Sequence, residues 1–129
     1  MGNAFADRRV LVTGHTGFKG SWLSLWLDEL GARVSGLALA PATDPALFTE
    51  AGLDRCLDHH LADIRDAHAV DEIVAATRPE IVFHLAAQSL VRASYPDPLG
   101  TYATNVMGTA HVLDAAQRHG VQAVVIVTS

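Results

Sequence analysis

The segment VTGHTGFKG constrains the fold most strongly, because it sets three glycines between a short apolar run and a helical pattern. Gly14, Gly17 and Gly20 follow an expected strand and open an expected helix. In this context the first glycine allows a tight turn, the second lets the backbone approach a pyrophosphate, and the third lets helix and strand pack closely. The N-terminus of the helix supplies amide donors and a positive dipole. The segment therefore predicts a loop that holds a diphosphate.

Two other interpretations of this loop fit the residues less well. A phosphate loop of the mononucleotide type needs a lysine directly after its last glycine and before Ser or Thr. The order here is Lys19, Gly20, Ser21, which makes a triphosphatase a poor interpretation. The plain alternative is a strand-to-helix turn without a ligand. Lys19 favours a ligand, since a cation in the first turn opposes the helix dipole unless an anion binds nearby.

Strand-like and helical segments alternate along the whole chain. Strands are expected near residues 9–13, 33–39, 57–61, 81–86 and 122–128, and helices near 22–30, 66–77 and 99–119. The connections are long enough for right-handed parallel crossovers. This rhythm predicts a single α/β domain over residues 1–129, with a doubly wound parallel sheet of the Rossmann type and strand order 3-2-1-4-5. Trp22 and Trp26, one helical turn apart, are expected to pack the first helix on the sheet.

Composition excludes several classes of function. The formal charge of -5 includes no basic stripe, so neither nucleic acid nor a membrane is an expected partner. No apolar segment is long enough for a membrane span, and the first residues lack a signal-peptide core, so a cytoplasmic location is expected. The single cysteine, Cys56, agrees with a reducing compartment and is expected in the core. The seven histidines lack a convergent ligand spacing, so no metal site is predicted.

The end of the second expected strand bears on the choice of cofactor. A nicotinamide site usually has an acidic residue there that binds the ribose hydroxyls, but the sequence reads LALAP. No Lys or Arg lies between Arg33 and Arg55 to bind a ribose phosphate, so NAD is favoured over NADP. Asp63, after the third expected strand, is in place either to accept a hydrogen bond from an adenine amine or to cap a turn.

Five motifs, VTGHTGFKG, ADIRD, HLAAQ, YATNVMGT and the final VTS, resemble in order and spacing those of the extended short-chain dehydrogenase/reductase family. Within it, GHTGFKGSWLSLWL together with IVFHLAAQSLVRASYPDP is similar to the CDP-glucose 4,6-dehydratase group. The resemblance implies a pyrophosphate loop made by Gly14, Gly17, Phe18 and Gly20 and lined by His15, Thr16 and Lys19. It implies that the adenine and the rest of the cofactor are met by Asp63, Ile64, Leu85, Ala86, Ala87, Gln88, Thr104 and Asn105. It also implies that the hydroxyl of Ser129 hydrogen-bonds the sugar hydroxyl that is oxidised.

The resemblance carries an expected activity for a complete enzyme. Such an enzyme would take a hydride from C4 of CDP-glucose onto NAD, lose water across C5 and C6, and return the hydride to C6. Its base would be a tyrosine with a lysine four residues later, because the cation lowers the tyrosine pKa. Tyr95 and Tyr102 are followed at that spacing by Leu99 and Val106. The chain is therefore expected to be an N-terminal fragment that binds NAD weakly and does not turn over substrate.

Two further functions stay open at this point. One is a related NAD(P)-dependent nucleotide-sugar enzyme, such as an epimerase or a GDP-mannose dehydratase, and the other is a non-catalytic dinucleotide-binding sensor. The long helical segment carries apolar residues on more than one face, among them Tyr102, Val106 and Met107. By resemblance, the second apolar face implies a homodimer or a higher homo-oligomer of the full-length protein, with the nucleotide sugar CDP-glucose as substrate.

Overall fold

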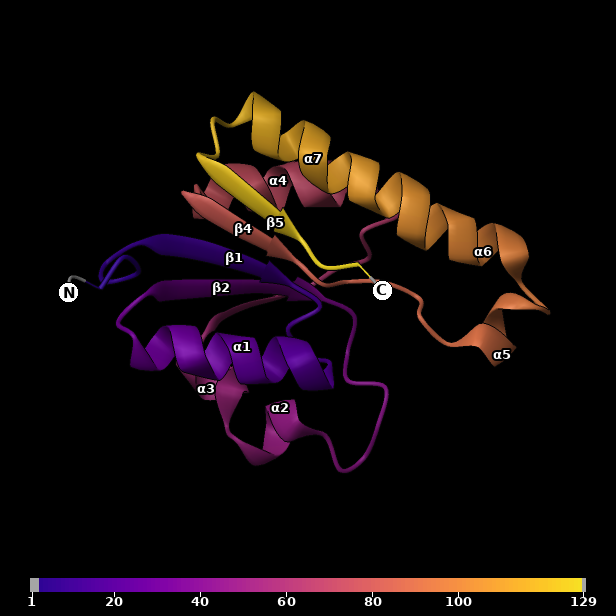
Figure 1. The fold of residues 1–129 in the computed structure, drawn as a ribbon, viewed down its shortest axis with the longest axis horizontal. Helices are drawn as coiled ribbons and strands as arrows, with labels where there is room; N and C mark the ends of the chain where they lie inside the picture. Colours follow the sequence, from indigo (N-terminus) through magenta and orange to yellow (C-terminus); the bar gives the residue numbers. More distant parts are fainter. Residues whose placement is uncertain (1–2, 129) are drawn as a thin grey trace.

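The computed structural model describes residues 3–128, which form a parallel sheet between two layers of helices (Figure 1). Its strands are β1 (Arg9–Thr13), β2 (Arg33–Ala38), β3 (Asp58–Leu61), β4 (Ile81–His84) and β5 (Ala123–Ile126). They lie in the order β3-β2-β1-β4-β5, and each neighbouring pair is parallel. The predicted α/β class, the parallel sheet and the strand order are confirmed. β2, β4 and β5 end earlier than expected, because the chain turns into loops there.

The centre of the sheet is buried on both faces. β1 pairs with β2 and β4, and its Val10, Leu11 and Val12 are at most 1% exposed. Successive side chains of a strand point to opposite faces. Val10 and Val12 therefore pack into one core, and Leu11 packs into the other. This double burial explains why the strand reads as a continuous apolar run.

One face of the sheet is covered by α1 (Phe18–Glu29), and the short helices α2 (Leu47–Glu50) and α3 (Leu53–Cys56) lie beside it (Figure 1). Leu27 of α1, Phe48 of α2 and Leu53 of α3 share a core with Val10 and Val12. The α2 segment follows a loop that contains Pro41 and Pro45. Cys56, expected in the core, is exposed, because α3 is a single turn of which only Leu53 is buried.

The prediction that Trp22 and Trp26 pack α1 on the sheet is wrong. Trp22 is 53% and Trp26 is 66% exposed, and the buried residues of the helix are Gly20, Ser21, Ser24 and Leu27. A Cβ at Gly20 would lie 2.0 Å from the Gly14 carbonyl oxygen. Helix and loop thus approach too closely for large side chains on that side, and the tryptophans lie on the other side of the helix.

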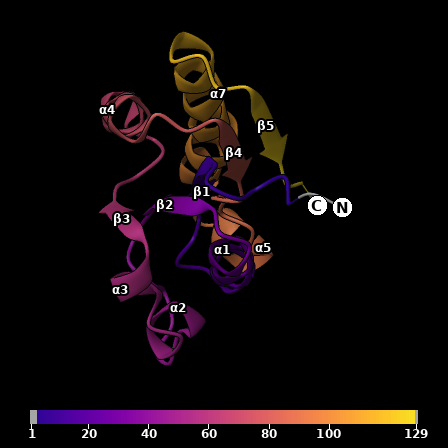
Figure 2. The ribbon, with the colours of Figure 1, turned by 90° about the vertical axis from the view of Figure 1, so that its left-hand side faces the viewer.

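The opposite face of the sheet is covered by α4 (Ala67–Thr77) and α7 (Gly108–Arg118), which contact each other (Figure 2). Side chains of both helices share a core with β1 and β4. α4 coincides with the helix expected over 66–77. Its N-cap Asp66 accepts a hydrogen bond from the Ala69 amide at 3.1 Å, and it ends at Arg78, which is left-handed and precedes Pro79.

The helix expected over 99–119 consists of three stretches, namely α6 (Pro98–Tyr102), the π-helical segment η1 (Ala103–Met107) and α7. The Asp97 carboxylate accepts from the Gly100 amide at 3.0 Å and caps its start. Its end precedes Gly120, whose φ of +69° is that of a left-handed glycine cap. A short helix, α5 (Val91–Ser94), comes before it. The π segment was not predicted, and such segments are frequent at functional sites.

Within residues 3–128 no helix has both the length and the apolar character that a membrane crossing needs.

Candidate functional site

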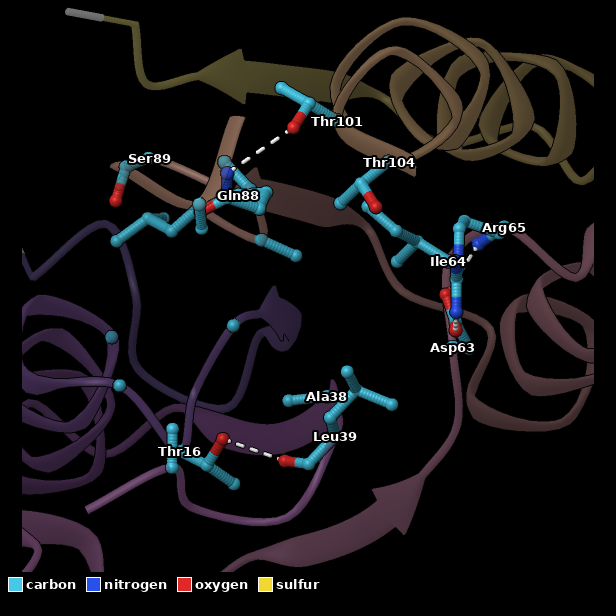
Figure 3. A pocket seen from close by; sticks show the side chains of 18 of the residues that line it. Thr16, Ala38, Leu39, Asp63, Ile64, Arg65, Gln88, Ser89, Thr101 and Thr104 are labelled. Atoms are coloured by element: carbon cyan, nitrogen blue, oxygen red, sulfur yellow. Dashed lines mark hydrogen bonds and ion pairs between the residues drawn. The ribbon is translucent and has the colours of Figure 1, made fainter. Parts of the chain in front are cut away.

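A pocket of about 830 Å³ lies at the carboxyl ends of the strands (Figure 3). The strand order reverses there, since the chain passes from β1 to β2 on one side and crosses from β3 to β4 on the other. In open α/β sheets such a switch point is where ligands bind. The lining comes from the glycine loop, from the residues after β2, β3 and β4, and from the long helix.

The three glycines of the loop have different surroundings. Gly14 has a φ of +77°, and a Cβ on it would lie 2.8 Å from the Ala86 amide nitrogen of the neighbouring loop. Gly20 approaches the Gly14 carbonyl, which confirms the predicted close packing of helix on strand. A Cβ at Gly17 would meet only the Gly14 carbonyl oxygen, at 3.4 Å. The loop is therefore closed behind Gly14 and Gly20 and open at Gly17, where a ligand has room.

The first turn of α1 presents a positive end to the pocket. Its N-cap is Gly17, which has no side chain to cap the helix, and the first turn contains no acidic residue. Lys19 in the same turn is exposed and lines the pocket. Uncapped amides, the helix dipole and an ammonium group all favour an anion at this position.

The wall next to this loop is apolar. It is formed at the end of β2 by Ala38, Leu39 and Ala40, and among the described residues none that lines the pocket here is a carboxylate. The Thr16 hydroxyl donates a hydrogen bond to the Leu39 carbonyl at 2.8 Å and ties the glycine loop to this wall (Figure 3).

The opposite wall follows β3 and is made by Asp63, Ile64 and Arg65 (Figure 3). The Asp63 carboxylate accepts from the Arg65 amide at 2.9 Å and from the Arg65 guanidinium at 2.9 and 2.6 Å. These hydrogen bonds from Arg65 lower the pKa of Asp63 below its usual value, so the carboxylate is ionised at neutral pH. Ile64 is buried, and a Cβ at Gly108 of α7 would lie 2.5 Å from its Cδ1. Asp63 thus caps its own turn and is also one of the residues that line the pocket.

The floor is fixed by Thr13, the last residue of β1. Its hydroxyl oxygen accepts from the Leu85 and Ala86 amides, each at 3.1 Å, and lies 2.7 Å from His84 Nδ1. A hydroxyl has two lone pairs and one proton. Because the two amides occupy the lone pairs, the proton is donated to His84 Nδ1.

That assignment determines the protonation of His84. With Nδ1 accepting, the neutral ring carries its proton on Nε2, which donates to the Thr109 hydroxyl at 2.8 Å. Thr109 in turn donates to the Asn105 carbonyl at 2.7 Å. Burial lowers the pKa of His84, in agreement with a neutral ring. A continuous chain of hydrogen bonds thus joins β1 and β4 to the long helix.

Asn105 of η1 holds the loop after β4. Its side-chain oxygen accepts from the Gln88 amide at 2.7 Å, and its side-chain nitrogen donates to the Gln88 carbonyl at 2.9 Å. The Gln88 side chain reaches Thr101 at 3.3 Å (Figure 3). The neighbouring Thr104 lines the pocket. Thr104 of η1 therefore lines the pocket, and the next residue, Asn105, holds the loop that forms the pocket floor.

The structure brings together nearly all residues that the sequence proposed for the cofactor. The pocket is lined by Gly14, Thr16, Gly17, Phe18, Lys19, Gly20, Asp63, Ile64, Leu85, Ala86, Ala87, Gln88 and Thr104. Asn105 lies behind the lining. Ser129, the expected catalytic residue, lies outside the described residues. Sequence reasoning missed Thr13, Thr109 and Arg65, because single hydroxyls and a loop arginine carry no distinctive spacing.

His15 is the exception, since its side chain does not line the pocket. It is fully buried on the other side of the loop, where its ring lies against Phe48 and its Nε2 is 2.6 Å from His59 Nδ1. The expectation that it lines the loop toward the ligand is therefore corrected. No group of three or more His, Cys, Asp or Glu side chains suited to a metal ion occurs in the described part of the chain.

Comparison with known proteins gives consistent sequence matches. Residues 11–129 match the family of GDP-mannose 4,6 dehydratase. CDP-glucose 4,6-dehydratase of Salmonella typhimurium is 53% identical over 128 residues, which are 98% of this chain and 36% of that protein. UDP-glucose 4-epimerase of Mycolicibacterium smegmatis is 38% identical over 122 residues, covering 94% of this chain and 38% of that protein. The chain spans about a third of the length of these curated relatives.

Solved structures match as well. A UDP-glucose-4-epimerase from Stenotrophomonas maltophila, solved with NAD and formylated UDP-arabinopyranose, has a TM-score of 0.83 and 29% identity over 95% of this chain and 37% of that chain. The UDP-glucose 4-epimerase of Thermus thermophilus, in complex with NAD, has a TM-score of 0.79 and 32% identity over 90% of this chain and 36% of that chain. Both structural relatives bind NAD.

Proposed function

Because the chain belongs to the GDP-mannose 4,6 dehydratase family, within the extended short-chain dehydrogenases/reductases, we propose that it forms the NAD-binding part of a dehydratase acting on CDP-glucose. The observation that carries this proposal is the pocket at the switch point of the sheet, with a glycine loop and an uncapped helix N-terminus on one side. The choice of CDP-glucose is supported by the similarity to the Salmonella enzyme.

The residues present fit a dinucleotide. The open space at Gly17 and the amides of the first turn of α1 would hold the diphosphate, with Lys19 adding a positive charge. Asp63, ionised and lining the pocket, would accept from the adenine amine. The apolar wall after β2 would meet the ribose without a carboxylate. Bound NAD would supply a hydride acceptor for oxidation of a sugar alcohol and return the hydride later in the cycle.

Other residues of this chain would orient and shield the cofactor. The chain of hydrogen bonds from Thr13 through His84 to Thr109 holds the Leu85 and Ala86 amides in place. Thr104 would face the cofactor from the helix, while Asn105 keeps Gln88 at the edge of the floor. Ser129 would hydrogen-bond the sugar hydroxyl. These groups bind and position, and a tyrosine and lysine four residues apart are not found in the sequence of these 129 residues.

The oligomeric state forms part of the proposal. Leu99, Tyr102, Val106 and Leu113 are 80%, 65%, 56% and 42% exposed. Their spacing places them in one stripe along the long helix. A second copy of the protein, packed on this stripe, would bury it in a homodimer. Light scattering of the protein and of a Val106→Glu variant tests this, and a monomer in both would contradict it.

The catalytic proposal is tested with the full-length protein that contains these residues. It is incubated with NAD and CDP-glucose, and the sugar is followed by nuclear magnetic resonance. We expect a 4-keto-6-deoxy sugar from CDP-glucose and much less product from UDP-glucose or GDP-mannose. Epimerised sugar would assign the protein to an epimerase activity instead, which the matches to epimerases keep as the second candidate. Absence of any product would reject the catalytic assignment.

A further inference from the structure

A cluster of two buried side chains and one half-buried side chain lies directly under the glycine loop and outside the pocket. It consists of His15 from the loop, Phe48 from α2 and His59 from β3. The His15 and His59 rings are 4.8 Å apart between centroids, and Phe48 lies 5.3 Å from the first and 4.9 Å from the second. None of these side chains lines the pocket. These side chains therefore contact the loop and would not contact a ligand in the pocket directly.

The register of the sheet explains how a loop side chain reaches β3. Gly36 of β2 pairs with His59, so both residues point to the same face. A Cβ at Gly36 would lie 2.4 Å from the His15 ring. The missing side chain of Gly36 thus leaves the space that the His15 ring fills. From this space His15 Nε2 reaches His59 Nδ1 at 2.6 Å.

The loop backbone at His15 is held from two directions. The Ser21 hydroxyl of α1 donates to the His15 carbonyl at 2.9 Å, and the preceding Gly14 amide donates to the Leu37 carbonyl of β2 at 2.9 Å. The ring supplies the third attachment, to β3. Because residue 15 lies between two glycines of the diphosphate loop, its position sets how far the loop stands above the sheet.

The polar groups of the ring are only partly satisfied. The contact with His59 needs one ring to donate and the other to accept, which two neutral rings provide. His15 Nδ1 is buried and makes no hydrogen bond to another side chain, and the polar group next to the ring is the Leu37 backbone, which raises the pKa of His15. The hydrogen bond to His59 is therefore the one attachment of the His15 ring to another side chain within residues 3–128.

We propose that His59 is a positioning residue for the cofactor diphosphate, acting through its hydrogen bond to His15 to hold the glycine loop at its binding height. This inference rests on the proposed NAD-binding function and adds a residue of β3 that touches neither pocket nor cofactor. Loss of the His59 contact should weaken binding of the diphosphate and not of the adenine, because Asp63 would bind the adenine and does not depend on the loop.

The test uses ligands that contain or lack the diphosphate. Binding of NAD, ADP and adenosine is measured by nuclear magnetic resonance titration for the unaltered protein, His59→Leu and His59→Asn. We expect His59→Leu to weaken NAD and ADP binding about tenfold, the effect of one hydrogen bond, and to leave adenosine binding within about twofold. His59→Asn keeps a polar atom near the position of Nδ1 and should restore most of the affinity for ADP. His68→Asn, at an exposed histidine of α4, is the matched control.

The outcomes separate the two proposals. If the unaltered protein binds neither NAD nor ADP, the proposed function fails and this inference falls with it. If it binds both, and His59→Leu binds ADP as tightly as the unaltered protein, the inference alone is rejected. An equal loss for adenosine and ADP also rejects it, since that result reflects general destabilisation. Should His59→Leu not fold, the ratio of ADP to adenosine affinity in His59→Ser, whose shorter side chain does not reach the His15 ring, gives the same decision.

Discussion

Two buried histidines support the pocket from below, and they differ in how completely their ring nitrogens are bonded. His84 lies under the floor, with Thr13 on one nitrogen and Thr109 on the other. His15 lies under the glycine loop, with His59 on one nitrogen and no side-chain partner among residues 3–128 on the other, which has only the Leu37 backbone near it. Both rings are almost fully inaccessible to solvent. The difference therefore lies in polar contacts and not in burial.

This difference indicates how each wall of the pocket responds to change. The floor under His84 is a closed chain in which every donor has an acceptor, so one tautomer is fixed and the strand end is rigid. The His15 side chain under the glycine loop is joined to β3 by a single contact between two titratable rings. Burial and the neighbouring His59 lower the pKa of His15 to about 4, while the Leu37 backbone opposes this shift. Substitution of its hydroxyl residues should therefore destabilise the floor, and protonation of His15 should destabilise the loop.

The largest effect is expected from Thr13→Val, which breaks the floor. The substitution leaves His84 Nδ1 and the Ala86 amide without their partner, while the Leu85 amide keeps the Thr13 carbonyl at 3.1 Å. Each unsatisfied buried group costs about 1–3 kcal/mol, so we expect a loss of about 4 kcal/mol in the free energy of unfolding. Urea denaturation measures it. Thr16→Val is the matched control, because Thr16 makes one hydrogen bond at the exposed rim and should lose less than about 1 kcal/mol. Similar losses for both variants would contradict the special role of Thr13.

Acidification should destabilise the glycine loop that lies over His15. A folded pKa of His15 near 4, below the unfolded value of 6.5, means that the unfolded chain binds more protons between these pH values. This contribution to stability is present above pH 6.5 and is lost as the pH falls toward 4, by up to about 3 kcal/mol. The groups packed on the ring are Gly36, Phe48 and His59, and the neighbouring His60 also disfavours its charge.

Denaturation curves between about pH 4 and 7 test this expectation. His84, whose pKa burial also lowers, adds a loss of the same sign in the unaltered protein. His15→Leu should flatten the curve, because it removes the larger shift and leaves that of His84. An equally steep curve in His15→Leu would show that other groups cause the acid sensitivity.

A Gly36→Ala substitution tests whether the His15 ring fills the space next to Gly36. The added methyl would meet the ring at 2.4 Å, and either the ring or the loop would have to move. We expect a loss of about 2 kcal/mol in stability, as for other overpacked cores. Thermal denaturation measures the loss. The control is Ser35→Ala, at the preceding residue of β2, whose side chain points to the opposite face, and its stability should change little. Gly31→Ala is not a suitable control, because Gly31 has a positive φ. Unchanged stability in Gly36→Ala would mean that the ring does not occupy this space in solution.

The smallest effect is expected from Thr109→Val, which removes only the far end of the floor network. His84 Nε2 would lose its acceptor, for a cost of about 1–2 kcal/mol. Imidazole nitrogen shifts of the labelled protein should report a proton on Nε2 in both the unaltered protein and the variant, since Thr13 still donates to Nδ1. A proton on Nδ1, or a charged ring at neutral pH, would contradict the assignment.

Much of the fold could be predicted because it depends on local patterns. The glycine spacing and the alternation of strands and helices were enough for the parallel sheet and its order. The helix expected over 66–77 matches α4 closely, because capping by Asp66 and the effect of Pro79 on Arg78 act within a few residues. The glycine loop was assigned from its spacing and its place between strand and helix, whereas the other pocket residues were implied by the family resemblance.

The features that were missed depend on close approach between distant segments. The orientation of α1 follows from the contact of Gly20 with Gly14, which leaves no room for Trp22 on that side. The direction of His15 follows from the space above Gly36, which lies in another strand. The π-helical segment at 103–107 has no composition that marks it. None of these can be read from spacing along the chain.

Titration of NAD into nitrogen-15-labelled protein, with the backbone amides followed, tests the proposed cofactor site most directly. If the pocket holds the dinucleotide, the amides of Gly17, Phe18 and Lys19 should shift and saturate together with that of Asp63. A Gly17→Ala variant should keep its stability, because its Cβ meets only one atom at 3.4 Å, yet lose the shifts of the loop. Saturating shifts that leave the glycine loop unchanged, or no shifts at all, would contradict the assignment of this pocket to NAD.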